Sequence, residues 1–256
     1  MTQNFSGQVA IVTGGSDGIG RSTARLLAER GAIVVICARR PDKLEEARAE
    51  IAAVGTVEAF QLDVTDDEAF TALVEDVAAR HGRLDMMVNN AMSVHYAPIL
   101  RLTLEHWRKD FAVNADAVFV GTKAAMKVMM AARRGSIVNI SSSCGIRAAP
   151  MMSSYSASKA ALIQFTAVAA MEAARSGVRV NAIVPGQVQT AGNEDFAAKA
   201  PEIASKTMDA IPMGRGGEPD ELAEAILFML SDAASYITGT ALPVDGGKAA
   251  QLYLPS

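Results

Sequence analysis

The sequence contains 256 residues, half of them hydrophobic, which is enough chain to enclose one large core, and we expect a single domain over residues 1–256. Its formal net charge of −4 leaves no broad basic surface for nucleic acid phosphates, so we expect no nucleic acid partner. No apolar run approaches the roughly 18 residues of a membrane span, and no basic and then apolar leader opens the sequence, so we expect a cytoplasmic protein with no membrane partner.

The first predicted unit is a buried strand followed by a glycine-rich turn and a helix. Val9 to Thr13 form a short apolar run, and an amphipathic helix is expected from about Arg21 to Arg30. A turn without Cβ atoms lets the backbone approach a pyrophosphate, which the free N–H groups and the dipole of a helix N-terminus stabilise. The residues expected to bind these phosphates are Gly14, Ser16, Asp17, Gly18, Ile19 and Gly20.

The second predicted strand, residues 32–37, ends where the adenosine ribose of a dinucleotide should lie. An acid there would bind the 2′-hydroxyl of NAD, but the sequence has Ala38 followed by Arg39 and Arg40. A guanidinium offers a fork of donors that suits the 2′-phosphate of NADP. We therefore predict NADP(H) as the cofactor, with Arg39 as its main contact, and two solvated arginines at a loop tip as the alternative.

Further strand and helix units follow in alternation. A charged helix is expected over residues 41–54, a strand over 57–62, and a helix that begins after Thr65 and ends near Gly82. The fourth strand, residues 84–88, leads into a polar turn. That turn contains Asn89, Asn90 and Ala91.

Two polar features lie in the next part of the chain. Residues 104–130 predict one long helix, and Asn114 lies in its apolar middle, where a buried amide needs hydrogen-bond partners. A buried strand over residues 135–140 then runs into three serines, of which Ser142 is the second. Ligands bind at the carboxyl ends of parallel strands, so this hydroxyl cluster is a candidate site.

Tyr155 opens a helix thirteen residues after Ser142, and Lys159 lies four residues further on the same helix face. A free tyrosine has a pKa of roughly 10, and an adjacent cation would lower this value and make the phenol a proton-transfer group. The alternative for such a tyrosine and lysine pair alone is a solvated helix face.

Together these features resemble the short-chain dehydrogenase/reductase family, in particular its NADP-dependent 3-oxoacyl-acyl-carrier-protein-reductase-like members. The resemblance covers nearly the whole chain and rests on Thr13-Gly14-x-x-x-Gly18-Ile19-Gly20 and on the spacing of Ser142, Tyr155 and Lys159. It implies that Ser142 holds the substrate oxygen, that Tyr155 passes the proton, and that Lys159 also binds the cofactor ribose. Asn114 would be the fourth catalytic residue, supporting a water that connects the lysine to solvent.

The resemblance also completes the expected cofactor site. Asp63 and Val64 would line the adenine pocket, and the turn after the strand at residues 178–184 would hold the carboxamide and phosphate. The full set of further cofactor-binding residues is Asp63, Val64, Asn90, Ala91, Tyr155, Lys159, Pro185, Gly186, Val188 and Thr190.

The substrate side departs from the family pattern, because Met92 stands where the family has glycine. We expect Met92, His95, Met152 and Gln187 to line the substrate pocket, with His95 at its rim. Methionines there suggest a flexible apolar site, and ordinary core filling is the alternative. Residues 191–215 show no clear period and exceed the usual loop length, which predicts a substrate lid.

The expected fold is a doubly wound, Rossmann-like parallel sheet in the order 3-2-1-4-5-6-7 with helices on both faces. The expected activity is hydride transfer between NADP(H) and a small ketone or secondary alcohol, as in a carbonyl reductase. The alternatives are a 3-oxoacyl thioester reductase and, from another class, an inactive dinucleotide-binding regulator. Scattered histidines and two isolated cysteines predict neither a metal site nor a disulfide, and we expect a homotetramer, with a homodimer as the second choice.

Overall fold

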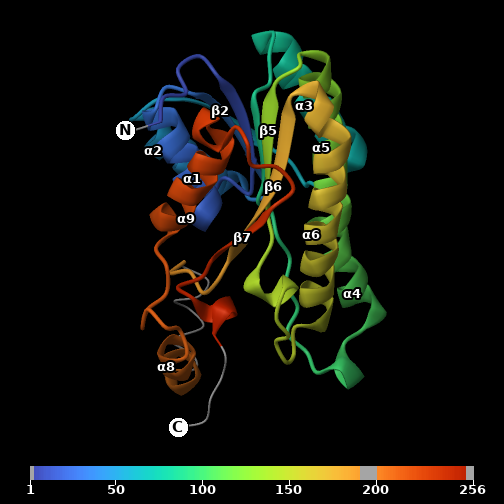
Figure 1. The fold of residues 1–256 in the computed structure, drawn as a ribbon, viewed down its shortest axis with the longest axis vertical. Coiled ribbons are helices and arrows are strands. Elements are labelled where there is room, and N and C mark those ends of the chain that lie inside the picture. The colour runs from blue at the N-terminus through green and yellow to red at the C-terminus, as the bar shows by residue number, and fades with distance from the viewer. Residues whose placement is uncertain (1–2, 191–200, 252–256) are drawn as a thin grey trace.

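A computed structural model describes residues 3–190 and 201–251 of the chain. Within these residues, seven parallel strands form one sheet in the order β3-β2-β1-β4-β5-β6-β7, which confirms the predicted topology (Figure 1). The strands are β1 (Val9–Thr13), β2 (Ile33–Ala38), β3 (Thr56–Gln61), β4 (Met86–Asn89), β5 (Gly135–Ile140), β6 (Val178–Pro185) and β7 (Ala241–Val244).

The helices pack on both faces of this sheet. One hydrophobic cluster joins the sheet to α1, α2 and α9, and a second joins its other face to α3, α5 and α6 (Figure 1). The helices are α1 (Gly18–Glu29), α2 (Pro41–Ala52), α3 (Asp67–His81), α4 (Leu104–Phe111), α5 (Ala117–Ala131), α6 (Ser153–Ala173), α8 (Pro201–Asp209) and α9 (Pro219–Leu230).

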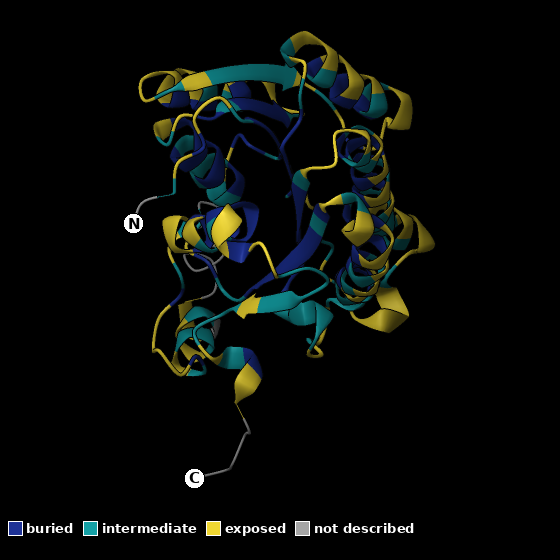
Figure 2. Ribbon diagram, turned by 45° about the horizontal axis from the view of Figure 1, so that its top comes forward, coloured by how far each residue is buried: buried dark blue, intermediate teal, exposed yellow. Residues whose placement is uncertain are grey.

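The central strands are buried on both faces, which explains why their sequences are continuous apolar runs without alternation. All five residues of β1 are buried, whereas β3 and β7, at the two edges, are only partly covered (Figure 2). The register pairs Ala10 with Val34 on one side and with Met86 on the other. Since every strand is parallel, all carboxyl ends lie at the same edge of the sheet.

The predicted long helix over residues 104–130 is unbroken but is not α-helical throughout. After α4, residues Ala112–Asp116 form one π-helical turn before α5 begins. Asn114 lies in this turn and is fully buried. The extra residue of a π turn changes which side chains share a face, and such turns often occur at functional sites.

The predicted lid lies partly outside the described residues, at positions 191–200. Its described part contains α8, so the expectation of a segment without regular structure is corrected there. The role of this segment as a lid stays a prediction. None of the helices in the described ranges is both long and apolar enough to cross a bilayer.

Candidate active site

Four side chains that the sequence analysis singled out meet at the carboxyl end of β5. Ser142 follows this strand, Tyr155 and Lys159 come from the first turns of α6, and Asn114 comes from the π turn. All four are buried, with at most 8% of their surface exposed. The fold therefore assembles hydroxyl, phenol, amine and amide groups from segments that are far apart in the sequence.

Lys159 is anchored to the sheet by its amine. Nζ donates a 2.7 Å hydrogen bond to the main-chain oxygen of Ile140, the last residue of β5, and lies 5.8 Å from the centre of the Tyr155 ring. Burial lowers the pKa of this amine from 10.5 to about 7. Desolvation penalises the charged form, so near neutral pH the lysine is poised between its two protonation states.

Tyr155 experiences the opposite shift. Burial raises its pKa to about 12, and this effect outweighs the hydrogen bond with Ser142, which lowers the pKa. The charged forms of Cys144, Tyr96 and Asp110 raise it further. The expectation that Lys159 lowers the tyrosine pKa is therefore corrected: burial dominates, and the desolvated amine is not among the groups that shift this pKa.

Asn114 connects the loop after β4 to α6. Its Nδ2 donates to the Ser93 oxygen at 2.8 Å and to Ser158 Oγ at 3.0 Å, and its Oδ1 accepts from the Ser93 N–H at 2.9 Å. Ser158 Oγ in turn donates to the main-chain oxygen of Tyr155. Both N–H groups of the amide are thus used within the protein, and its expected link to a catalytic water stays a prediction.

The glycine turn between β1 and α1 has the geometry of a phosphate cradle. Gly14 and Gly18 have φ angles of +64° and +49°, and a Cβ on Gly20 would lie 2.4 Å from the Gly14 oxygen. The first N–H groups of α1, at Ile19 and Gly20, have no helical acceptor. Thr190 lies against Gly18, since a Cβ there would lie 3.1 Å from Thr190 Cγ2. The turn after β6 therefore reaches the cradle.

The two arginines after β2 differ in their environment. Arg40 pairs with Asp17 at 3.5 Å, whereas the side chain of Arg39 is exposed and has no partner among the described residues. Asp17 also caps α1 by accepting the Gly18 N–H at 2.8 Å. It therefore places a negative charge beside the region where the sequence analysis expected phosphate groups.

The remaining predicted cofactor residues lie at the same edge of the sheet, and several make structural contacts. Asp63 accepts bonds from the N–H and hydroxyl of Thr65. Asn90 Nδ2 donates to the main-chain oxygens of Thr13 and Gly14. Gly186 donates to Val244, and Val188 pairs with Gly217. These residues hold the turns together, and their expected role as cofactor contacts stays a prediction. Buried Val64, half-buried Ala91 and Pro185 at the end of β6 complete this edge.

Thr13 is a residue that the sequence analysis named only as part of a motif. Its Oγ1 accepts the N–H groups of Asn90 and Ala91 at 2.9 and 3.1 Å, so one hydroxyl fixes the turn after β4 beside the glycine cradle. A hydroxyl at the end of an otherwise apolar strand is the sequence signal that could have indicated this role.

The expected substrate residues lie in three loops, after β4, before α6 and after β6. Met92 is half exposed, Met152 Sδ lies 3.9 Å from Cys144 Sγ, and His95 is held by Asp110. The main-chain oxygen of Gln187 accepts a hydrogen bond from the Gly217 N–H. The sequence analysis did not select Tyr96, Cys144 or Asp110 for this region, although Asp110 lies one helical turn before Asn114.

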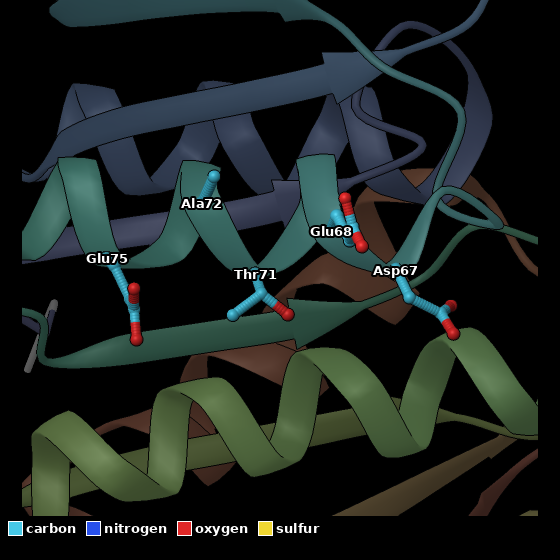
Figure 3. A pocket seen from close by; sticks show the side chains of 5 residues that line it. All are labelled: Asp67, Glu68, Thr71, Ala72 and Glu75. Atoms are coloured by element: carbon cyan, nitrogen blue, oxygen red, sulfur yellow. The ribbon is translucent and has the colours of Figure 1, made fainter.

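A separate hollow on the outer side of α3 contains none of these residues (Figure 3). Its lining is Asp67, Glu68, Thr71, Ala72 and Glu75. Glu75 pairs with Lys127 of α5 at 2.8 Å. The hollow is open and acidic, and its lining contains no phenol, amine or amide side chain like those near the carboxyl end of β5.

Comparison with known proteins shows extended similarity. The family described as Enoyl-(Acyl carrier protein) reductase matches residues 14–249. The 3-oxoacyl-acyl-carrier-protein reductase FabG of Thermotoga maritima is 39% identical over 244 residues, 95% of this chain and 98% of the relative. Cis-4-hydroxycyclohexanecarboxylate dehydrogenase of Sinomonas cyclohexanicum is 42% identical over 252 residues, 98% of this chain and all of the relative.

A solved structure shows the same fold. The putative NAD(P) dependent gluconate 5-dehydrogenase of Beutenbergia cavernae, with bound NADP, superposes with a TM-score of 0.92. It is 37% identical, and the match covers 98% of this chain and 100% of that chain.

The burial of Lys159 predicts a pH-dependent change in stability. Its pKa falls from 10.5 unfolded to about 7 folded, so the cost of burying a charge is fully present below pH 7 and disappears as the pH rises toward 10.5. Lys159→Met should therefore stabilise the fold below pH 7 by up to about 5 kcal/mol, since each pKa unit corresponds to about 1.4 kcal/mol, and this gain should shrink toward pH 10.5. Thermal unfolding of both proteins as a function of pH measures it.

Lys127→Met is the matched control, because that ammonium is exposed and pairs with Glu75. It should not stabilise the fold at any pH in this range. A Lys159→Met gain that did not vary with pH would show that the amine is not desolvated as described.

Proposed function

This chain belongs to the short-chain dehydrogenase/reductase family and is an oxidoreductase acting on CH–OH and C=O groups with NAD(P), and we propose that its cofactor is NADP(H) and its substrate a small, largely apolar ketone or secondary alcohol. The observation that carries this proposal is the convergence of Ser142, Tyr155 and Lys159 at the carboxyl end of β5 beside a glycine cradle. Bound NADP(H) supplies or accepts the hydride.

The residues of this chain fit such a cofactor. The cradle at Gly14 to Gly20 has no room for an added Cβ at Gly20, and α1 presents free N–H groups there. Arg39 offers an exposed guanidinium at the end of β2, where a ribose phosphate would lie. Lys159, with its amine anchored on β5, would hold the ribose next to the reacting ring.

The proton is moved by the protein's own side chains. Ser142 would hold the substrate oxygen, and Tyr155, whose pKa Ser142 lowers, would give a proton to that oxygen or remove one from it. At neutral pH the phenol holds its proton and so has one to donate to a carbonyl oxygen, although its raised pKa makes it a weaker acid than a free tyrosine. For alcohol oxidation, Lys159 must be charged to favour the phenolate, and a pKa near 7 allows this.

Two other functions remain to be separated by experiment. The Thermotoga relative supports a 3-oxoacyl thioester reductase. The Sinomonas relative and the exposed Met92 in the loop after β4 support an enzyme of free alcohols or ketones. An inactive regulator would have no need of the converging Ser142, Tyr155 and Lys159. Turnover of a panel of cyclic and open-chain ketones, alcohols and acyl thioesters with NADPH or NADP distinguishes all three.

Tyr155→Phe should remove nearly all turnover, because it deletes the transferable proton and keeps the ring. Proton transfer by a positioned side chain contributes about a hundred- to ten-thousandfold, so kcat should fall by that factor while NADPH affinity is retained. Tyr236→Phe, at a fully exposed position, is the control and should change neither value. A phenylalanine variant with wild-type kcat at saturating substrate would refute the role of Tyr155.

Cofactor preference gives a second prediction. Ala38 offers no acceptor for a 2′-hydroxyl, and Arg39 is free to bind a 2′-phosphate while Arg40 is engaged by Asp17. Arg39→Gln should weaken NADPH binding by about ten- to a hundredfold and leave NADH binding unchanged. Ala38→Asp combined with Arg39→Gln should move the preference toward NAD.

Fluorescence titration with NADPH and NADH measures both affinities, and kcat/KM with each cofactor gives the preference. Arg40→Gln is the matched control and should have the smaller effect. A wild-type protein that uses NAD at least as well as NADP would overturn the NADP assignment.

We further propose a cytoplasmic homotetramer, with a homodimer as the second choice. Phe119 of α5 and Val168 and Met171 of α6 are large apolar side chains that remain exposed on one face of the protein. Apolar patches on such helices are typical of isologous interfaces.

Light scattering at micromolar concentration should show four subunits. Met171→Lys should lower the mass, and a monomeric wild-type protein would contradict both assemblies.

A further inference from the structure

Asp110 of α4 is a buried carboxylate, fully excluded from solvent. Its Oδ1 accepts from Ser93 Oγ at 2.8 Å and from His95 Nδ1 at 2.7 Å. Its Oδ2 accepts from Ser154 Oγ at 2.5 Å and from the His95 N–H at 3.3 Å. Burial raises its pKa, but these hydrogen bonds outweigh that effect and leave the pKa below its ordinary value. Asp110 is therefore a buried anion.

The donors come from two segments outside α4. Ser93 and His95 lie in the loop after β4, and Ser154 lies in the first turn of α6, directly before Tyr155. A buried charge is costly unless its partners are in place. The carboxylate therefore stabilises one relative placement of this loop and the start of α6.

Asp110 and Asn114 bind the same two segments in parallel. Asp110 accepts from Ser154, and four residues later Asn114 donates to Ser158. The residues that follow these two serines are Tyr155 and Lys159. Asp110 and Asn114 therefore each bind the residue directly before one of the two reactive residues on α6.

The backbone that leads into α6 needs such support. Met151 has a φ of +66°, a left-handed conformation that residues with a Cβ rarely adopt. The Ala97 N–H donates to the Met151 oxygen at 2.9 Å, so the loop after β4 contacts this segment a second time. His95, stacked on His106 with ring centres 4.3 Å apart, fixes the loop on α4.

We propose that Asp110 is a positioning residue, which through Ser154 fixes the first turn of α6 and so aims Tyr155 at the substrate oxygen. The inference rests on the proposed proton-transfer role of Tyr155. Asp110 touches neither substrate nor cofactor in this role. It acts by holding the phenol in register with Ser142 and Lys159.

Two variants test the role from different directions. Asp110→Asn keeps the shape and removes the charge, and Ser154→Ala removes only the hydroxyl that contacts it. Misplacement of a reacting group by about 1 Å costs on the order of a hundredfold, so both variants should lower kcat about ten- to a hundredfold. NADPH affinity, measured by fluorescence, should be unchanged because neither residue lies in the glycine cradle.

Asp85→Asn is the matched control. Asp85 is the other buried aspartate among the described residues, but it accepts the Val9 N–H at the amino end of β1, far from the site. It should lower the melting temperature as Asp110→Asn does, with kcat retained. If the kcat of Asp110→Asn and Ser154→Ala, per folded enzyme, is as high as that of Asp85→Asn, the proposal is wrong.

The pH profile provides a readout that a merely structural role would not move. Burial and the charges of Cys144, Tyr96 and Asp110 raise the Tyr155 pKa, and Ser142 lowers it. Lys159 lies on the same helix face. Removing the Asp110 charge should lower the apparent pKa of kcat/KM, whereas Ser154→Ala should not. A profile that is unshifted in Asp110→Asn would count against the proposal.

These outcomes are separable from failure of the proposed function. Wild-type kcat in Tyr155→Phe would remove the proton-transfer role itself. An inactive Tyr155→Phe together with fully active Asp110→Asn and Ser154→Ala would overturn only the positioning role of Asp110.

Discussion

The contact between the Lys159 amine and the main-chain oxygen of Ile140 is the interaction on which the arrangement of the site depends. It joins α6 to the last residue of β5 and buries the amine almost completely. Ser142 lies two residues beyond Ile140, and Tyr155 lies one turn before Lys159. Ser141 Oγ donates a second bond, at 2.9 Å, to the main-chain oxygen of Lys159. Together these two hydrogen bonds hold the end of β5 against α6, and with it the hydroxyl that would hold the substrate oxygen near the phenol that would protonate it.

Burying these groups has an electrostatic consequence for both. The Lys159 pKa falls to about 7 and the Tyr155 pKa rises to about 12, so each group favours its neutral form. An amine beside a phenol favours the phenolate only to the extent that the amine is charged. The phenol is thus protonated at neutral pH, and the stability of its phenolate depends on the protonation state of the lysine.

A polar network beneath the site supports this arrangement. Asn89 of β4 donates to Asn139 of β5 at 2.8 Å, and Asn139 donates to Thr166 of α6 at 3.0 Å. Such buried groups are costly unless their hydrogen bonds are made, so they define one register between the sheet and the helix. At the end of β2, the Asp17 and Arg40 pair shows that the charge is more balanced than the two consecutive arginines alone suggest.

Local patterns in the sequence, namely apolar runs, glycine spacing and a four-residue helical repeat, indicated the strands, the glycine turn and the shared helix face of Tyr155 and Lys159. The strand order, which the structure confirms, and the grouping of Ser142 with those two residues came from the resemblance to the family. The sequence also indicated that Asn114 would be buried. Only the tertiary structure decided what Asn114 and Asp110 bind, since Ser154 lies 44 residues from Asp110. The π turn, helix α8 and the contact of Thr13 with the turn after β4 were likewise unpredicted. The directions of the pKa shifts also required the fold, because desolvation depends on which segments pack around a group and a local sequence pattern contains no record of them.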